Sequence, residues 1–219
     1  MLLTKALFKV VSNNLSPYPI WVRRFRQPCH NKLVSENVYY HATLLLTAPL
    51  TVQEDKGGKR VSVEIAGKPF PLILKRKMQS VLEAHPPGEN ELDVILWPRT
   101  DKEGLLGSGT QLATYLPAGE AKKAQGLHAL GELVKLDRED ALIQVQIHPN
   151  PKQGGLHKPF RLPLVVSMEL MDGLPEIGSG LEVWADLEPT TGQVVLKKVR
   201  AVPLPPKRVV QPSSDKKAE

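Results

Sequence analysis

The chain has 219 residues, of which 41% are hydrophobic and 24% are charged, a composition typical of globular proteins. Its single cysteine excludes an internal disulfide and a zinc site built from several thiolates. No stretch approaches the ~18 consecutive apolar residues of a membrane-spanning helix, so we expect no membrane partner. The 20 prolines and 16 glycines favour short strands joined by turns over long helices.

The net charge of +6 is concentrated at the two ends of the chain. Residues 1–35 carry six bases and no acid, and residues 206–219 carry four bases and two acids. Residues 36–118 carry nine bases and ten acids, and residues 119–205 carry ten bases and eleven acids. The predicted folded body is therefore almost neutral, unlike a uniformly basic nucleic-acid-binding domain.

The first 35 residues combine apolar residues at helical spacing with a later segment in which arginines alternate with aromatic rings. The arginines are Arg23, Arg24 and Arg26. Three interpretations of this basic N-terminal arm stay open. It is a disordered or spurious extension, an organelle-targeting peptide, or an arm that binds an anion or a partner.

From Val38 onward the sequence pattern changes to strands, rich in β-branched and aromatic residues or alternating between apolar and polar positions. In the first half of the body the predicted strands are 38–47, 61–65, 70–74, 92–97 and 111–116, with a short helix over 78–84. In the second half the predicted strands are 127–134, 143–147, 160–168, 181–186 and 194–202, the last two joined by a hairpin turn at 190–192.

Short letter matches indicate that the second half repeats the first. The segment Lys68–Leu72 matches Lys158–Leu162 at an offset of 90 residues, and Leu92–Val94 matches Leu181–Val183 at an offset of 89. A nearly constant offset favours a duplicated unit of that length.

Five strands with a possible helix between the third and the fourth resemble an oligonucleotide/oligosaccharide-binding (OB) barrel. The resemblance is one of strand order and identifies no specific family. The predicted fold is mostly β, with two tandem five-stranded OB-like barrels and a short helix in the first. The predicted domains are a basic N-terminal arm (1–35), a first barrel (36–118), a second barrel (119–205) and a disordered tail (206–219).

The sequence contains no convincing catalytic, metal or cofactor motif. The glycine-rich segment Gly104–Thr110 lacks the lysine of a phosphate-binding loop and is predicted to be a turn. The six histidines show no zinc-ligand spacing and are expected to be solvated loop residues. Asp93 and Glu182 are expected on the polar face of a fourth strand, and Cys29 lies in the arm, where a catalytic role is not expected. We therefore expect a protein that is not an enzyme and needs no cofactor.

The basic clusters are the candidate binding residues, because lysine and arginine side chains neutralise phosphates and aromatic rings stack on bases. The candidates are Lys75, Arg76, Lys77, Lys197, Lys198, Arg200, Arg23, Arg24, Arg26, Trp97 and Trp184. The alternative interpretation is ordinary solvated surface charge.

The sequence thus predicts a non-enzymatic binding protein for single-stranded DNA or RNA, or for a ribonucleoprotein. The alternative is a protein–protein scaffold or assembly factor that docks partners by edge pairing without touching nucleic acid. We expect a cytoplasmic protein, or an organellar one if the arm is a targeting peptide.

Overall fold

The computed structural model describes residues 39–55, 58–88, 90–150, 156 and 158–205. All of them belong to one compact unit, Glu36–Glu219. The predictions for the N-terminal arm and for the tail lie outside these residues. Within the described ranges, no helix has both the length and the apolar character needed to cross a membrane.

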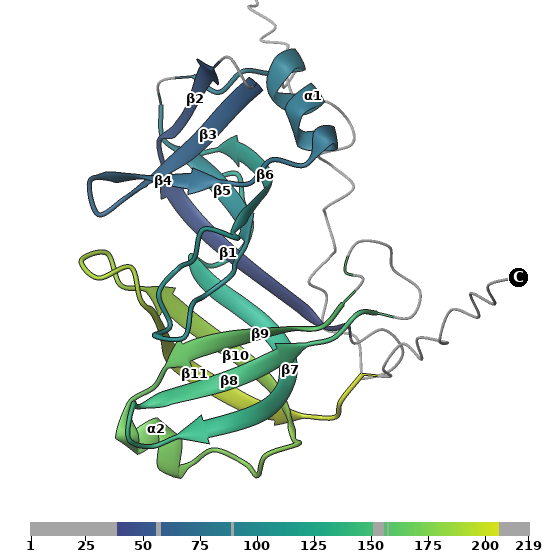
Figure 1. Ribbon diagram of the computed structural model, residues 1–219, viewed down its shortest axis with the longest axis vertical. Helices are drawn as coiled ribbons and strands as arrows, with labels where there is room; N and C mark the ends of the chain where they lie inside the picture. Colours follow the sequence, from purple (N-terminus) through teal and green to yellow (C-terminus); the bar gives the residue numbers. More distant parts are fainter. Residues whose placement is uncertain (1–38, 56–57, 89, 151–155, 157, 206–219) are drawn as a thin grey trace, which may run out of the picture. The chain divides into compact units, whose positions relative to one another are not determined.

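The described chain is mostly β, as predicted (Figure 1). The first half contains β1 (His41–Ala48), β2 (Leu50–Asp55), β3 (Gly58–Ile65), β4 (Lys68–Leu72), α1 (Arg76–Ala84), β5 (Leu92–Trp97) and β6 (Gln111–Pro117). The second half contains β7 (Gly126–Asp137), β8 (Leu142–Ile147), β9 (Phe160–Val165), α2 (Met168–Asp172), β10 (Gly180–Leu187) and β11 (Val194–Val202).

The five strands of the second half pair in a closed ring. Strand β7 pairs with β8, β8 with β9, β9 with β11 in parallel, β11 with β10, and β10 again with β7. Helix α2 lies between the third and fourth strands of this ring in chain order. This is the strand order of an OB-like barrel, so the predicted fold-level resemblance is confirmed.

The first half is divided between two sheets. Strands β2, β3 and β4 form a three-stranded sheet, while β1, β5 and β6 belong to an eight-stranded sheet that includes the whole second half. A parallel bridge between Ile73 and Gln111 connects the two groups, and β1 pairs directly with β7 across the two halves. The prediction of two separate tandem barrels is therefore not confirmed in that form. The boundary predicted at residues 118/119 falls between β6 and β7 and stays a prediction.

Two elements differ from the sequence-based expectation. The sequence of residues 53–60 is typical of a polar turn, but residues 53–55 belong to β2 and residues 58–60 to β3, and the two strands pair. The strand predicted over 160–168 ends at Val165, and α2 follows it. Ser167 is the N-cap of α2, and its side chain accepts a hydrogen bond from the Leu170 backbone N–H. An N-cap serine followed by Gly173 at the other end is a helix signal that the strand pattern concealed.

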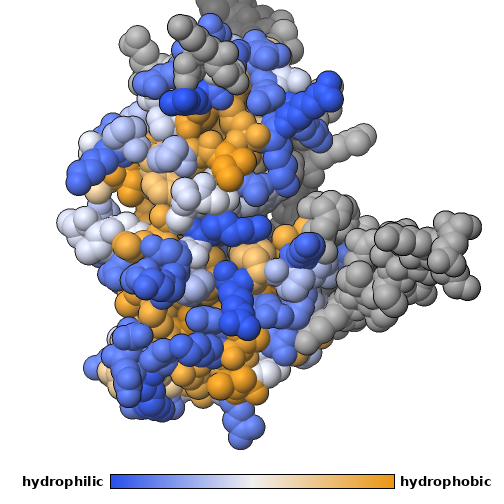
Figure 2. Space-filling model, in the orientation of Figure 1, coloured by the Kyte–Doolittle hydropathy of each residue, from blue (hydrophilic) through white to orange (hydrophobic). Residues whose placement is uncertain are grey.

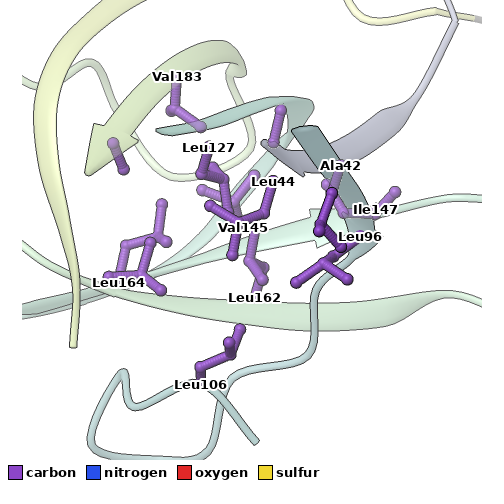
Figure 3. Packing of buried hydrophobic residues seen from close by; sticks show 14 of the residues in the cluster. Ala42, Leu44, Leu96, Leu106, Leu127, Val145, Ile147, Leu162, Leu164 and Val183 are labelled. Carbon is purple, nitrogen blue, oxygen red and sulfur yellow. The ribbon is translucent and has the colours of Figure 1, made fainter. Parts of the chain in front are cut away.

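The core is continuous across both halves because the shared sheet turns one face of every strand inward. Figure 3 shows Leu44 and Leu96 from the first half packed in the same cluster as Leu127, Leu162 and Val183 from the second. Leu106 reaches this cluster from the loop between β5 and β6 (Figure 3). The loop therefore contributes to the core instead of running free as a simple turn.

The two halves share a structural irregularity at equivalent positions. The β5–β6 ladder shifts register between Ile95 and Leu96, and the β10–β11 ladder shifts between Trp184 and Ala185. These two positions are separated by the 89-residue offset that the sequence match predicts. A bulge at the same place in both halves is expected of a duplicated unit, and the internal duplication stays a prediction.

Candidate nucleic-acid interface

One row of buried side chains fixes which way the neighbouring residues point. Leu96 pairs with Leu44, Leu44 with Leu127, and Leu127 with Ala185, across strands β5, β1, β7 and β10. All four are core residues that are almost completely buried. Because side chains alternate along a strand, the residues next to them in sequence lie on the opposite side of the sheet.

That opposite side carries a second row, which we call the outer sheet face. Thr43 pairs with His128, His128 with Trp184, and Trp184 with Lys198. Trp97 follows Leu96 on β5 and so points to the same side. The outer sheet face thus carries both tryptophans that the sequence singled out within the folded body.

Trp184 is surrounded by cationic and aromatic neighbours. The His128 ring stacks on the indole with ring centroids 5.3 Å apart and an angle of 21° between the planes. The Lys198 Nζ lies 5.1 Å and the Arg200 Cζ 6.0 Å from the indole centroid. Both distances fall within the range of cation–π attraction.

A chain of hydrogen bonds runs along the neighbouring positions. His41 Nδ1 lies 2.9 Å from the Tyr39 carbonyl oxygen, His41 Nε2 lies 3.2 Å from His128 Nδ1, and His128 Nε2 lies 2.9 Å from Glu182 Oε1. Arg200 donates to the other Glu182 oxygen. The Tyr39 carbonyl and the Glu182 carboxylate can only accept, so His41 Nδ1 and His128 Nε2 donate the two outer bonds, and the bond between the rings needs one further proton on either His41 Nε2 or His128 Nδ1.

Burial and neighbouring charges set the titration of this chain. Burial is the main cause that lowers the pKa of His41, with further lowering by the charges of His128 and Lys123. Burial alone would raise the pKa of Glu182, but hydrogen bonds from His128 and Arg200 hold it below its ordinary value. Glu182 is therefore already bonded to side chains of the protein itself.

A second cation–aromatic pair lies in the first half. The Lys75 Nζ is 4.4 Å from the Trp97 ring centroid. Lys75 is the N-cap residue of α1, and Arg76 and Lys77 are exposed in the first turn of that helix. The structure thus brings Lys75, but not its two basic neighbours, to a described aromatic ring.

The remaining sequence candidates lie elsewhere. Lys197 lines a cleft of about 450 Å³ together with Glu64, Asp186 and Glu188, and Trp184 is not part of its lining. Arg23, Arg24 and Arg26 lie outside the described residues. On the face that Figure 2 shows, hydrophobic and hydrophilic residues are interspersed instead of forming one continuous hydrophobic surface.

The expectation of solvated loop histidines is wrong for three of them. His41 and His128 belong to the chain above, and His148 is buried with its Nε2 2.7 Å from Glu132 Oε2. Sequence alternation alone does not show that β1 and β7 are neighbours, so the pairing of these side chains could not be foreseen. Across the described residues, no group of three or more histidine, cysteine or carboxylate side chains is arranged to hold a metal ion.

The two strand carboxylates are also less solvated than expected. Asp93 is only 2% exposed and accepts hydrogen bonds from the Thr47 hydroxyl, at 2.7 Å, and from the Ala121 backbone N–H, at 2.8 Å. Glu182 is bonded to His128 and Arg200, as described above. Both acids do lie on the outward side of their strands, but each is bound to partners within the protein.

The sequence interpretation missed Arg99, the second residue of the loop between β5 and β6. Its guanidinium carbon lies 3.5 Å from the centroid of the Phe160 ring on β9. Gly107 and Gly109 in the glycine-rich segment that follows leave room for Arg99. The segment was predicted to be a plain turn because nothing in the sequence places it against the second half.

A scan against models of known protein families and a search of curated proteins found no match. Among solved structures, the chain is similar to the single-stranded DNA binding protein from Thermus aquaticus, with a TM-score of 0.41 and 12% identity, covering 78% of this chain and 96% of that chain. A deletion mutant of the Thermus aquaticus protein gives a TM-score of 0.39 and 15% identity, covering 80% and 97%. The tetrameric p202 HIN2 structure gives 0.25 and 14%, covering 76% and 96%. These likenesses are distant and concern the fold alone.

Proposed function

We propose that this protein is a non-enzymatic binding protein that holds single-stranded nucleic acid on the outer sheet face. The observation that carries the proposal is the pairing of a tryptophan with a lysine in each half of that face, Trp97 with Lys75 and Trp184 with Lys198. Single-stranded nucleic acid is bound by this combination, because rings stack on bases while ammonium and guanidinium groups neutralise phosphates.

The spacing of the two pairs suits an extended ligand. Trp97 and Trp184 lie on strands β5 and β10, which are separated by β1 and β7 in the shared sheet. Three steps between neighbouring strands place these positions about 14 Å apart along a flat sheet. A nucleic-acid strand that contacts both tryptophans would therefore extend over several nucleotides and over both halves of the protein.

The charge balance of the face also supports the proposal. Of its carboxylates, Glu182 is bonded to His128 and Arg200 and Asp93 is bonded to Thr47 and Ala121, while the exposed Asp186, on the same side of β10 as Trp184, lines the cleft that Lys197 also lines. Lys198 and Lys75 are exposed and lie over indole rings. A nearly neutral body can therefore still present a local positive surface, and only this local charge matters to a phosphate backbone.

The proposal is tested by fluorescence anisotropy of labelled single-stranded DNA and RNA over a range of salt concentrations, using the full chain. We expect the double variant Trp97→Ala/Trp184→Ala to weaken binding by about 1–3 kcal/mol for each stacked base that is lost. The double variant Lys75→Gln/Lys198→Gln should flatten the salt dependence, by about 0.7 in the log–log slope for each phosphate contact removed.

Arg138→Gln serves as the control, because Arg138 is paired with Asp172 at an exposed position and lies outside the outer sheet face. It removes one positive charge and should leave the affinity almost unchanged. Equal affinity of all these variants would remove the outer sheet face from the binding site. A partner protein that copurifies through high salt and nuclease treatment, with no oligonucleotide binding, would instead support the scaffold alternative.

A further inference from the structure

We propose that Arg99, held between the Phe160 ring and a glycine-rich turn, is a phosphate-binding site formed jointly by the two halves. The inference rests on the proposed function and extends it, because it assigns a phosphate contact to a residue outside the paired lysines. Arg99 lies two residues beyond Trp97, so their Cα atoms are at most about 7 Å apart. The two backbone positions are therefore close neighbours.

The backbone of Arg99 is fixed by the loop to which it belongs. Its N–H donates to the Thr110 hydroxyl at 3.1 Å, and its carbonyl accepts from the Gly107 N–H at 2.6 Å. Thr110 is fully buried, so this anchor belongs to the rigid part of the loop. The side chain consequently starts from a defined position.

Two glycines lie close to Arg99, Gly109 to its side chain and Gly107 to its backbone carbonyl. A Cβ atom on Gly109 would lie 3.2 Å from the Arg99 Cγ, and one on Gly107 would lie 3.2 Å from the Arg99 carbonyl oxygen. Both contacts are tighter than ordinary van der Waals distance. The glycine-rich sequence is thus explained by the space that Arg99 needs.

Phe160 confines the guanidinium. The Arg99 Cζ lies 3.5 Å from the centroid of this ring, which belongs to β9 in the second half. A planar guanidinium that lies over a ring keeps its in-plane N–H groups directed outward along its edges. The site therefore needs the loop of the first half and the strand of the second.

The guanidinium lacks a counter-ion among the described residues. It takes part in none of the ion pairs found there, and its one hydrogen bond runs from Nη1 to the Pro98 carbonyl at 3.2 Å. An arginine has five N–H donors, so most of them are left for a ligand. Every buried side-chain nitrogen in the described part of the chain has a partner, so the unused Arg99 donors are accessible to solvent.

A phosphate matches these donors in charge and geometry. Arginine binds phosphate oxygens through two parallel hydrogen bonds, and such charge-assisted bonds are about twice as strong as neutral ones. A partly buried cation without a carboxylate also gains more from an anion than a fully solvated cation does. Burial lowers the pKa of Arg99, in agreement with this incomplete solvation, although the group stays charged.

The test compares the full-length Arg99→Gln and Arg99→Lys variants with Arg138→Gln, which makes the same change at an exposed, ion-paired arginine. Oligonucleotide affinity is measured against salt, and folding is checked by thermal unfolding. We expect Arg99→Gln to lose about tenfold in affinity and to flatten the salt slope by about 0.7, while Arg138→Gln changes neither. Arg99→Lys should recover the slope but not the full affinity, because lysine lacks the planar fork.

A second measurement keeps this inference separate from the proposed function. Inorganic tripolyphosphate is added to each variant and the shift in unfolding temperature is recorded. A stabilisation that Arg99→Gln abolishes and Trp97→Ala/Trp184→Ala retains supports the Arg99 site even if oligonucleotide binding is absent. Folded Arg99→Gln that behaves as wild type in both assays would overturn the site, whatever the tryptophan variants show.

Discussion

The indole of Trp184 touches neighbours of two kinds, and each has a different consequence. His128 stacks on it and belongs to a hydrogen-bonded chain with His41 and Glu182, which holds the local geometry. Lys198 lies over it without a carboxylate partner among the described ion pairs. At the scale of single residues, the histidines therefore orient the ring and the lysine is available to a ligand.

The lowered pKa of His41 makes a prediction about stability. Its ordinary value is 6.5, and the folded protein resists protonation more than the unfolded chain does. The contribution of His41 to the free energy of unfolding is therefore complete above pH 6.5 and is lost as the pH falls through the lowered folded pKa. We expect urea denaturation to show falling stability below that pH.

The variant His41→Gln should lack this part of the pH dependence. Glu182 also has a lowered folded pKa, but its contribution disappears only as the pH falls below about 4.5. The two effects therefore occupy separate pH windows. Wild-type and His41→Gln curves that stay parallel from neutral pH to pH 5 would contradict the assignment.

At the scale of elements, the loop between β5 and β6 connects the two halves. Thr100 donates to the Pro163 carbonyl at 2.8 Å, and the Leu106 N–H donates to the Gly192 carbonyl at 3.0 Å. The Val194 N–H returns a bond to the Gly104 carbonyl at 2.9 Å. The loop thus contacts both β9 and the β10–β11 hairpin. Neither of these belongs to the strands that the loop itself connects.

Alanine variants at two glycines measure how much the packing of this loop against β9 contributes to the free energy of unfolding. Gly104 and Gly192 both have a φ of +75°, but a Cβ on Gly104 would lie 3.1 Å from Val165 Cγ2, whereas nothing lies within 4 Å of one on Gly192. Each alanine variant carries a backbone cost of about 1–2 kcal/mol. We expect Gly104→Ala to lose about 1–3 kcal/mol more, through overpacking against β9. Urea denaturation of both variants measures the difference, and equal losses would show that the contact adds nothing.

The sequence predicted individual strands better than their partners. The alternation in residues 61–65 identified β3, because the half-buried face of this strand leaves a direct periodic signal. The pairing of β1 with β7 leaves no such signal, since register depends on contacts between distant segments. For the same reason Trp97 and Trp184 could be selected as candidates, whereas His128 and Arg99 could not.

At the scale of the whole molecule, the shared sheet joins both halves through their cores. Leu44 and Leu127 pair across β1 and β7 and are fully or almost fully buried. The buried residues of the two halves are therefore in direct contact at this pair of strands. The β5–β6 loop adds a second connection between the halves. The folded body should therefore unfold as one cooperative unit.

The prediction is tested with single-tryptophan reporters, in which Trp21 and either Trp97 or Trp184 are replaced by phenylalanine. Both reporters should give the same urea midpoint, although they lie in different halves. Leu127→Ala should lower both midpoints together, with a loss of about 2–5 kcal/mol for a buried leucine. Separate midpoints, or a shift confined to the Trp184 reporter, would show that the halves unfold independently.

The matched bulges have one further consequence, for engineering. Just before the bulge in the second half, Trp184 lies opposite Lys198, and at the equivalent place in the first half Ile95 lies opposite Thr114. The two halves therefore offer the same backbone platform with different side chains on it. Thr114 is only 3% exposed whereas Lys198 is exposed, so a tryptophan–lysine pair built by Ile95→Trp/Thr114→Lys would also require the packing around residue 114 to be opened.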